Sequence, residues 1–241
     1  MAEQKTITWL YGAWVAGGLL LGLALVALLG YEGSFLWANR HHAPWADVLF
    51  RHLTNLGDAQ ITLGLVGLVV ARRYPAALLL AALAAAVAGL LGQLLKRAVF
   101  YEWERPLAVL GEAAVHWVGP ERLYRHSFPS GHATASLAMA TALALTLPLQ
   151  RWGVTLVAWL GLLAAYSRVY IGAHFLGDVV AGAALGALVA FGLARAWGQR
   201  WQRFFESRSP ATRRWVGWGL SALAFAVLLK GLLARYPGLV G

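Results

Sequence analysis

Long apolar stretches recur along this chain, and short polar segments separate them. A helix needs about 20 apolar residues to cross the hydrocarbon core of a membrane, so the pattern predicts a series of membrane-spanning helices. The expected spans lie near residues 8 to 30, 54 to 71, 75 to 95, 132 to 148, 152 to 170, 175 to 195 and 215 to 234. The second and fourth are short for a crossing. The expected fold class is all-α, a polytopic membrane helical bundle with a six-span core and an additional C-terminal hydrophobic helix.

A basic stretch separates the last apolar segment from the other six. Residues 195 to 214 are polar and rich in arginine, whereas the other connections are short and contain no Pro/Ser-rich linker. We therefore expect a single integral-membrane domain over 1–241. Its core is expected at 1–196, followed by a cytoplasmic basic segment at 197–214 and an appended hydrophobic helix at 215–234. The pattern leaves open whether that helix crosses the membrane.

The composition supports a membrane protein and excludes several kinds of chemistry. The chain is 60% hydrophobic and only 12% charged, which is far from the balance of a soluble domain. It has no cysteine, which excludes disulfides, thiolate metal sites and a cysteine nucleophile. The net charge of +10 is dispersed among loops and does not form one aromatic-interleaved stripe, so anionic lipid is a better expected partner than nucleic acid.

The basic residues favour an orientation with the N-terminus in the cytoplasm. Arg72, Arg73, Arg151 and the stretch from 195 to 214 then face the cytoplasm, as the positive-inside rule expects. The first span is expected to be retained, because no small-residue cleavage pattern precedes the charged loop expected at 31–40.

This orientation gathers the conspicuous polar residues at the outer ends of the spans. Ionisable groups beside apolar segments are rare because desolvation disfavours them, so they indicate a functional site. The residues concerned are spread over some eighty positions yet fall at one expected membrane level: Lys96, Arg105, Ser130, His132, Arg168, His174 and Asp178.

Two residues of this set, His174 and Asp178, suggest a nucleophile and its partner. His174 and Asp178 are four positions apart, which on a helix places them on one face within reach of each other. A neutral imidazole attacks phosphorus when its other nitrogen donates to a carboxylate that fixes the tautomer. His174 is therefore the candidate nucleophile, Asp178 its orienting group, and His132 the candidate general acid and base.

The remaining residues suit an anion. The segment from Ser127 to Thr134 reads as a loop leading into a helix, whose free N–H groups, with Ser130 and Gly131, form a candidate phosphate site. Arg105 and Arg168 offer forked donors and Lys96 a point charge. Charge stabilisation of this kind is the main catalytic need in phosphoryl transfer.

Together these residues resemble the type-2 phosphatidic acid phosphatases, a family of lipid phosphatases that shares its site with vanadium haloperoxidases. The family's middle motif, Pro-Ser-Gly-His, stands at 129–132. Its last motif, Ser-Arg, five residues, His, three residues, Asp, begins at Ser167 and ends at Asp178. The first motif, a lysine six residues before Arg-Pro, differs here. Eight residues separate Lys96 from Arg105, and Arg97 is the substitute for the lysine if the insertion is not tolerated.

The resemblance implies a metal-independent, cofactor-free reaction through a phosphohistidine at His174. It implies a lipid phosphate or diphosphate substrate and no obligatory protein partner. Bacterial members of this size act on undecaprenyl diphosphate, phosphatidylglycerophosphate, phosphatidic acid or lipid A phosphates. The expected location is the bacterial cytoplasmic (inner) membrane, with the site facing the periplasm and headgroup selection by loops at 31–53 and 97–127. Some relatives pass the phosphoryl group to another lipid instead of water.

Two functions of other classes stay open from the residues themselves. The first is a transporter in which Arg168, His174 and Asp178 form a proton or ion relay, although such a protein would carry polar groups through the depth of several spans. The second is a lipid-binding protein without catalysis. The histidines of the outer loops lack the paired spacing of a zinc site, so no metal is expected. They are His41, His42, His52, His116 and His126.

Overall fold

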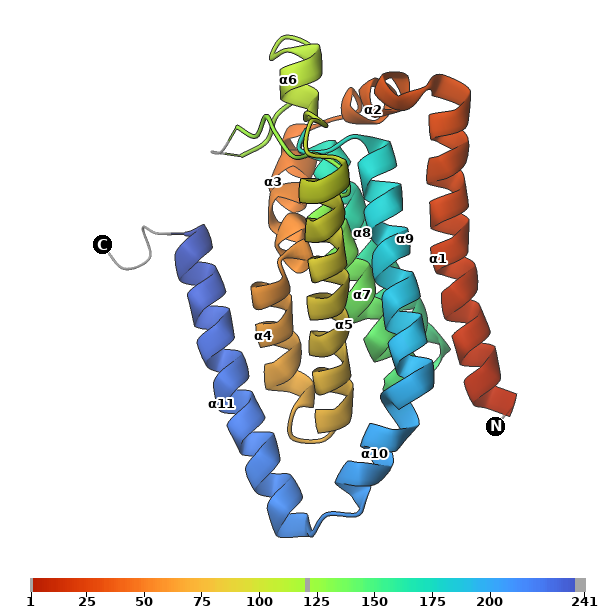
Figure 1. The fold of residues 1–241 in the computed structure, drawn as a ribbon, viewed down its shortest axis with the longest axis vertical. Helices are drawn as coiled ribbons and strands as arrows, with labels where there is room; N and C mark the ends of the chain where they lie inside the picture. The colour runs from red at the N-terminus through yellow and green to blue at the C-terminus, as the bar shows by residue number, and fades with distance from the viewer. Residues whose placement is uncertain (1, 120–121, 237–241) are drawn as a thin grey trace.

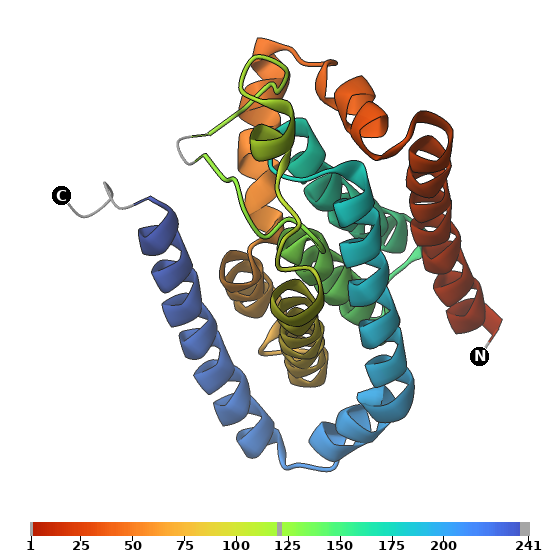
Figure 2. The same ribbon diagram turned by 45° about the horizontal axis from the view of Figure 1, so that its top comes forward.

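The computed structural model describes residues 2–119 and 122–236, and for residues 2–5 it describes the backbone only. Every regular element in those residues is a helix, arranged as a bundle with α1 on one flank and α11 on the other (Figures 1 and 2). The first half contains α1 (Ala2–Leu29), α2 (Tyr31–Asn39), α3 (Pro44–Leu53), the 3-10 turn η1 (Thr54–Gly57), α4 (Ala59–Val70), α5 (Pro75–Leu94), the π-turn η2 (Leu95–Val99) and α6 (Pro106–Leu110). The second contains α7 (Gly131–Thr146), α8 (Arg151–Tyr170), α9 (Leu176–Leu193), the π-turn η3 (Ala194–Gly198), α10 (Gln199–Glu206) and α11 (Pro210–Arg235).

The helices confirm a multi-pass membrane bundle. Five are long and apolar enough to cross a membrane, namely Thr6–Leu29, Pro75–Val99, Arg151–Tyr170, Leu176–Glu206 and Pro210–Arg235. The helices Pro44–Gly57 and Ala59–Val70 are apolar enough to pass as one span together, but they are bent by 78° at the break between them, as in a broken span or a re-entrant loop. The span expected at 54–71 is therefore divided into the 3-10 turn η1 and the helix α4. Asp58 starts a new helix at the bend by accepting the N–H groups of Gln60 and Ile61, at 2.9 and 3.1 Å.

The fourth expected span forms the centre of the bundle. Helix α7 packs against α5, α8 and α9, and each of its residues from Ala133 to Ala144 is buried. Glycines on α9 allow the closest of these contacts. A Cβ at Gly182 would lie 2.4 Å from the Ser130 carbonyl oxygen, and one at Gly186 would lie 2.1 Å from that of Thr134. Apolar periodicity alone did not reveal that α7 is surrounded by protein.

The predicted loop at 31–40 is wrong, because residues Tyr31–Asn39 form α2. Glu32 in its first turn suits the positive end of the helix, and Phe35 and Ala38, one turn apart, are both buried. Asn39 fixes the end of α2 to the bundle by donating to the carbonyl oxygens of Val169 and Tyr170, at 3.1 and 2.9 Å. These hydrogen bonds and the buried side chains attach α2 to one end of the bundle.

The appended helix α11 lies along α4 and has the length and hydropathy of a span. Glycines again allow the two helices to lie close together. A Cβ at Gly67 would lie 2.4 Å from Ala224 Cβ, and one at Gly217 would lie 2.8 Å from Arg72 Cα. The basic stretch before α11 is also helical, since α9 continues through η3 and α10 to Glu206. The chain turns back after α10, and α11 runs back alongside the bundle and ends below the level of α2 and α6 (Figure 1).

Candidate active site

The polar residues singled out in the sequence come together at one end of the bundle, which we call the site end. The end of α5 contributes Lys96, the start of α7 contributes Ser130 and His132, and the last turn of α8 contributes Arg168. His174 lies in the connection from α8 to α9, and Asp178 lies in the first turn of α9. Arg105 immediately precedes α6.

His174 and Asp178 are in contact inside the protein. The distance from His174 Nδ1 to Asp178 Oδ2 is 3.3 Å, and their side chains are only 2% and 0% exposed. The expected reason for the contact, two residues on one helical face, is wrong, because α9 begins after His174. Instead, Asp178 reaches back to accept the Phe175 N–H at 3.0 Å, and the connection before it bends at Gly172, whose φ of 80° suits glycine. Helix capping therefore presents the carboxylate to the imidazole.

Two hydroxyl groups that the sequence analysis did not assign complete the environment of Asp178. Tyr31 of α2 donates to Oδ1, and Ser127 donates to Oδ2. Burial, and then the nearby Asp178 carboxylate, raise the pKa of Tyr31, so its hydroxyl stays protonated and able to donate. Both carboxylate oxygens are thus held. Ser127 adjoins the Pro-Ser-Gly-His motif, but nothing in the local sequence around Tyr31 indicates this role.

The second ring nitrogen of His174, Nε2, points towards Arg105. Arg105 Nη1 lies 3.2 Å from His174 Nε2 and donates to the carbonyl oxygen of Ala173 at 3.0 Å. Because the Asp178 carboxylate accepts at Nδ1, the proton of the neutral ring belongs there and the lone pair belongs on Nε2. Burial, followed by the charges of Arg105, Arg168 and Lys96, holds the pKa of His174 well below its usual range. The arrangement favours a neutral imidazole whose unprotonated Nε2 faces Arg105.

The cations of the site differ in how they are held. Burial lowers the pKa of Arg105 to about 10, with Asp178 opposing the shift. Arg168, only 5% exposed, donates from Nη1 to Thr54 Oγ1 of η1 at 2.8 Å. Its Nε is buried with no hydrogen-bond partner among the described residues. A phosphate oxygen would satisfy such a donor.

The structure separates the two candidates for the first-motif cation. Lys96 is 8% exposed and its charge acts on both His174 and Asp178, whereas Arg97 is exposed. The π-turn η2 contains both residues and follows directly from α5. Such turns re-aim side chains within a helix and are frequent at functional sites. The geometry therefore associates Lys96 with the cluster despite the lengthened spacing.

At the start of α7, Ser130 caps the helix and is buried, whereas His132 is half-buried. Ser130 is buried, and its Oγ accepts the N–H of Ala133 at 3.5 Å, as an N-cap residue does. Its own N–H donates to the carbonyl oxygen of Asp178 at 3.0 Å, which ties α7 to α9. Gly131 is exposed. His132, half-buried, packs against Gly57, where a Cβ would lie 2.8 Å from that of the histidine.

One further cation reaches the cluster from the appended helix. Arg235, at the end of α11, acts electrostatically on His132 and Arg168. The neighbouring Tyr236 holds this end in place, because Asn55 of η1 donates to its hydroxyl oxygen at 2.9 Å. The basic character of Arg235 in an otherwise apolar helix end was the only sequence signal for this role.

Two of the outer histidines, His42 and His116, form a separate small network. His116 Nε2 lies 2.9 Å from Asp47 Oδ1, Tyr170 donates to the same carboxylate at 2.7 Å, and His42 stacks on His116. Within residues 2–119 and 122–236, no three His, Asp or Glu side chains lie close enough together to hold a metal ion.

Comparison with known proteins decides the family. The model of the PAP2 superfamily matches residues 77–203 of this chain. The chain belongs to the PAP2 superfamily. This confirms the resemblance seen in its motifs, and solved membrane proteins of the PAP2 type confirm the fold class. The matched region includes the cluster from Lys96 to Asp178 but not Tyr31, Thr54 or Arg235.

Curated relatives of this PAP2 protein match it over its motif region. The undecaprenyl-diphosphatase of Sulfolobus acidocaldarius is 41% identical over 66 residues, which are 27% of this chain and 31% of the relative. The lipid A 1-phosphatase of Rhizobium johnstonii is 47% identical over 64 residues, 25% of this chain and 24% of the relative. The chain thus matches less than a third of the length of these relatives.

Two solved structures match over a larger share. The crystal structure of Aquifex aeolicus LpxE has a TM-score of 0.56 and 28% identity, and covers 67% of this chain and 92% of its own. The PAP2-type phosphatidylglycerolphosphate phosphatase of Bacillus subtilis has a TM-score of 0.53 and 23% identity, and covers 78% and 97%. At that identity the second likeness concerns the fold alone.

Proposed function

We propose that this protein is an integral-membrane lipid phosphatase that hydrolyses a phosphate monoester or diphosphate of a lipid through a phosphohistidine at His174. The observation that carries the proposal is the orientation of His174. Its Nδ1 lies 3.3 Å from Asp178, and its Nε2 faces the guanidinium of Arg105 at 3.2 Å. A nucleophile with an oriented partner and an adjacent cation is the arrangement that phosphoryl transfer requires.

In the first step His174 Nε2 forms a bond to phosphorus as the bond from phosphorus to the lipid oxygen breaks. The imidazole keeps its Nδ1 proton, and Asp178 stabilises the positive charge that develops on the ring. His132 gives a proton to the departing oxygen, which leaves as the lipid alcohol or the lipid monophosphate. In the second step His132 accepts a proton from water as the water oxygen attacks phosphorus. Inorganic phosphate and free His174 result.

The charges around Nε2 supply transition-state stabilisation. Lys96, Arg105 and Arg168 surround the imidazole and match the phosphoryl oxygens in charge, and Ser130 and Gly131 contribute the start of α7. We include Arg235 as a cation at the edge of the same cluster. For a lipid diphosphate, we propose that Arg235 contacts the phosphate that is not attacked.

The substrate class follows from the surroundings of the site and from the relatives. The cluster lies at the ends of membrane-spanning helices, so a phosphate attached to a lipid reaches it from the membrane surface. The similar proteins are named for undecaprenyl diphosphate and the 1-phosphate of lipid A. We propose undecaprenyl diphosphate or a glycerophospholipid phosphate as the first substrates to test. We also propose the cytoplasmic membrane as the location, with the site on its outer face.

The test is phosphate release from a panel of lipid phosphates by purified protein in detergent with a chelator present. The expected result is release by the wild type without added metal and none by His174→Ala, with Lys230→Ala as a matched control that retains activity. Release by His174→Ala equal to that of the wild type, or dependence on a divalent metal, would overturn the mechanism. Transfer of phosphate to an added acceptor lipid in place of release would identify a phosphotransferase.

A further inference from the structure

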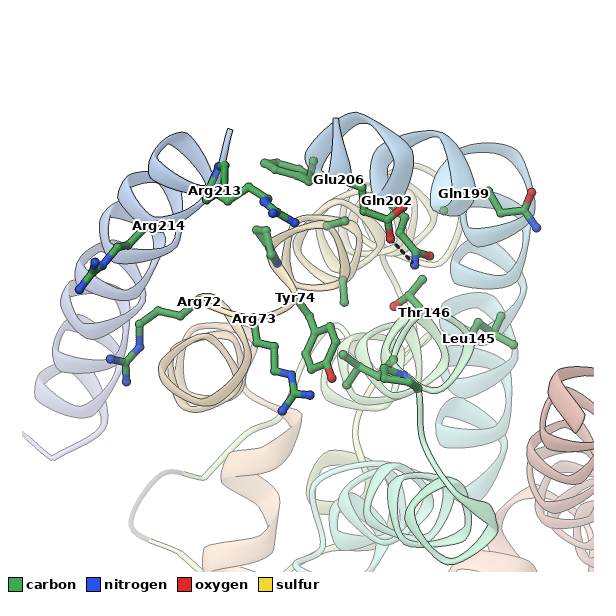
Figure 3. A pocket seen from close by; sticks show the side chains of 18 of the residues that line it. Arg72, Arg73, Tyr74, Leu145, Thr146, Gln199, Gln202, Glu206, Arg213 and Arg214 are labelled. Atoms are coloured by element: carbon green, nitrogen blue, oxygen red, sulfur yellow. Dashed lines mark hydrogen bonds between the residues drawn. The ribbon is translucent and has the colours of Figure 1, made fainter. Parts of the chain in front are cut away.

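A second basic cluster lies at the opposite end of the bundle from His174. The turn from α4 to α5, the end of α7, α10 and the start of α11 enclose a cavity of about 760 Å³ there (Figure 3). The length of α5 separates this cavity from the site, because α5 begins at the cavity and is followed at its other end by η2, which contains Lys96. Its size is within the range of small-molecule sites.

The cavity gathers positive charge with little to balance it. Arg72 and Arg73 come from the α4–α5 turn, and Arg213 and Arg214 come from α11. Glu206 is the only acidic residue in the lining, and its carboxylate accepts a hydrogen bond from Gln202 at 3.0 Å. None of the four arginines forms an ion pair within the part of the chain that the structure describes. The four guanidinium groups are exposed, so water and salt screen part of their mutual repulsion, and an anion bound between them would offset more of it.

Two of the four arginines, Arg73 and Arg213, point towards the other side chains that line the cavity. In Figure 3, Arg73 lies beside the ring of Tyr74 and Arg213 extends towards Glu206, whereas Arg72 and Arg214 point away from Glu206. The Arg72 guanidinium lies over the ring of Trp218, 4.6 Å from its centroid, which fixes its direction. Planar forked donors of this kind recognise phosphate oxygens.

The level of the cavity relative to the membrane indicates what kind of anion reaches it. The apolar helices α5 and α11 both start at this level, so the arginines lie where lipid headgroups meet water. Trp215, 76% exposed, lies on the first turns of α11 as an interfacial tryptophan does. Part of the lining is apolar, including Ala76, Leu147 and Phe205, which suits the glycerol and upper acyl carbons of a lipid.

We propose that this cavity binds the phosphate-bearing headgroup of an anionic lipid from the leaflet opposite the one that supplies the substrate. Basic pockets between membrane helices on the cytoplasmic side are a recurrent form of lipid site. The bound phosphate would lie between the α4–α5 turn and the start of α11. It would therefore stabilise the attachment of α11, which is otherwise held along α4 by close glycine contacts.

The test compares two double variants of the full-length protein that lose the same charge. Arg73→Ala/Arg213→Ala removes two cavity arginines, and Arg151→Ala/Arg200→Ala removes two exposed arginines outside the cavity lining. Lipid retention is measured by native mass spectrometry and by the rise in Tm in a neutral detergent. The added lipids are phosphatidylglycerol, phosphatidylcholine and an anionic lipid whose charge is a sulfonate, and inorganic phosphate is a further arm. Arg213→Gln replaces the first double variant if that variant fails to fold.

The expected result is that phosphatidylglycerol binds the control variant as it binds the wild type. Its affinity for the cavity variant should be about tenfold weaker or more, since two charge-assisted contacts are lost. The sulfonate lipid and phosphatidylcholine should give smaller rises in Tm with the wild type. Equal weakening in both double variants, or no weakening in either, would overturn the proposal. Full competition by millimolar inorganic phosphate would show that the occupant is a free anion and not a lipid.

Discussion

The two ends of the bundle both concentrate cations, but they hold them in opposite ways. At the site end, Lys96 and Arg168 are 8% and 5% exposed, and a carboxylate with both oxygens held lies among them. At the other end, Arg73 and Arg213 are exposed around an open cavity. Buried cations at fixed positions suit charge that develops during a reaction, because they need no reorganisation. Exposed cations suit reversible binding of an anion.

This contrast predicts the largest effect for the partner of His174. Asp178→Asn keeps the size of the side chain but presents an amide to Nδ1, so the imidazole loses its fixed tautomer and its counter-charge. We expect kcat to fall about 10⁴-fold, as for the equivalent change in other His/Asp pairs. Arg200→Ala, an exposed residue near the opposite end, is the control and should leave kcat within about twofold of wild type. A fall of less than tenfold in the Asp178 variant would contradict the role of the carboxylate.

The next largest effect is expected at Arg168. It tests whether the forked donors of the buried guanidinium matter in addition to its charge. Arg168→Lys retains a cation but loses the planar fork, in which Nη1 donates to Thr54 and the separate Nε is left for a phosphate oxygen. We expect kcat to fall about 10²-fold or more, because a preorganised transition-state donor is lost. Steady-state kinetics on a lipid monophosphate checks this. Activity equal to wild type would mean that the unpartnered Nε does not face the substrate.

A smaller effect is expected where α11 meets the cluster. Arg235→Ala should raise KM for a lipid diphosphate about tenfold and change KM for the matching monophosphate less, because one charge-assisted contact is lost. Lys230→Ala on the same helix is the matched control. If both variants behave alike on both substrates, the appended helix contributes no contact to the substrate.

The rigidity of the site end can be tested through the seam between α7 and α9. Gly186→Ala places a Cβ 2.1 Å from the Thr134 carbonyl oxygen, whereas Gly192→Ala, further along α9, meets nothing within 4 Å. We expect the first substitution to destabilise the protein by about 1 to 3 kcal/mol, the usual cost of overpacking. The second should raise stability slightly, since alanine is the better helix former. Thermal unfolding in detergent measures both, and equal Tm values would show that the seam is loose.

The smallest expected effect is a shift in the pH dependence of kcat/KM, which tests whether the buried cations act on His174. Burial and the neighbouring cations keep the pKa of His174 low, so the imidazole remains neutral and nucleophilic below the usual histidine range. Arg105→Gln removes one of those cations, which raises the pKa of His174. Protonation then removes the nucleophile at a higher pH. The acid limb of kcat/KM should therefore move to higher pH, and an unmoved limb would separate it from His174.

Much of the architecture and most of the cluster could be predicted from the sequence. Hydropathy located the spans because the membrane requires long apolar segments. Motif spacing located His132, Arg168, His174 and Asp178, since these residues lie close to helix ends that the chain brings to one level. The failures concern packing. Periodicity could not show that α7 is enclosed by protein or that the second span bends at Asp58.

The missed residues have a common cause. Tyr31 and Thr54 contact Asp178 and Arg168 across 147 and 114 positions of the chain, and Arg235 reaches the cluster only because α11 lies along α4. Neither hydropathy nor local spacing carries information about such pairings. The predicted loop at 31–40 failed for the same reason, because burial of Phe35 against Phe175 stabilises α2.

The central claim is a covalent intermediate on His174, and the stereochemical course at phosphorus tests it most directly. A lipid phosphate made chiral with three oxygen isotopes is converted in the presence of methanol, and the configuration of the methyl phosphate formed is determined. Two successive in-line displacements, first by His174 and then by the acceptor, predict net retention. Net inversion would mean that the acceptor attacks the substrate directly and would contradict the phosphohistidine mechanism.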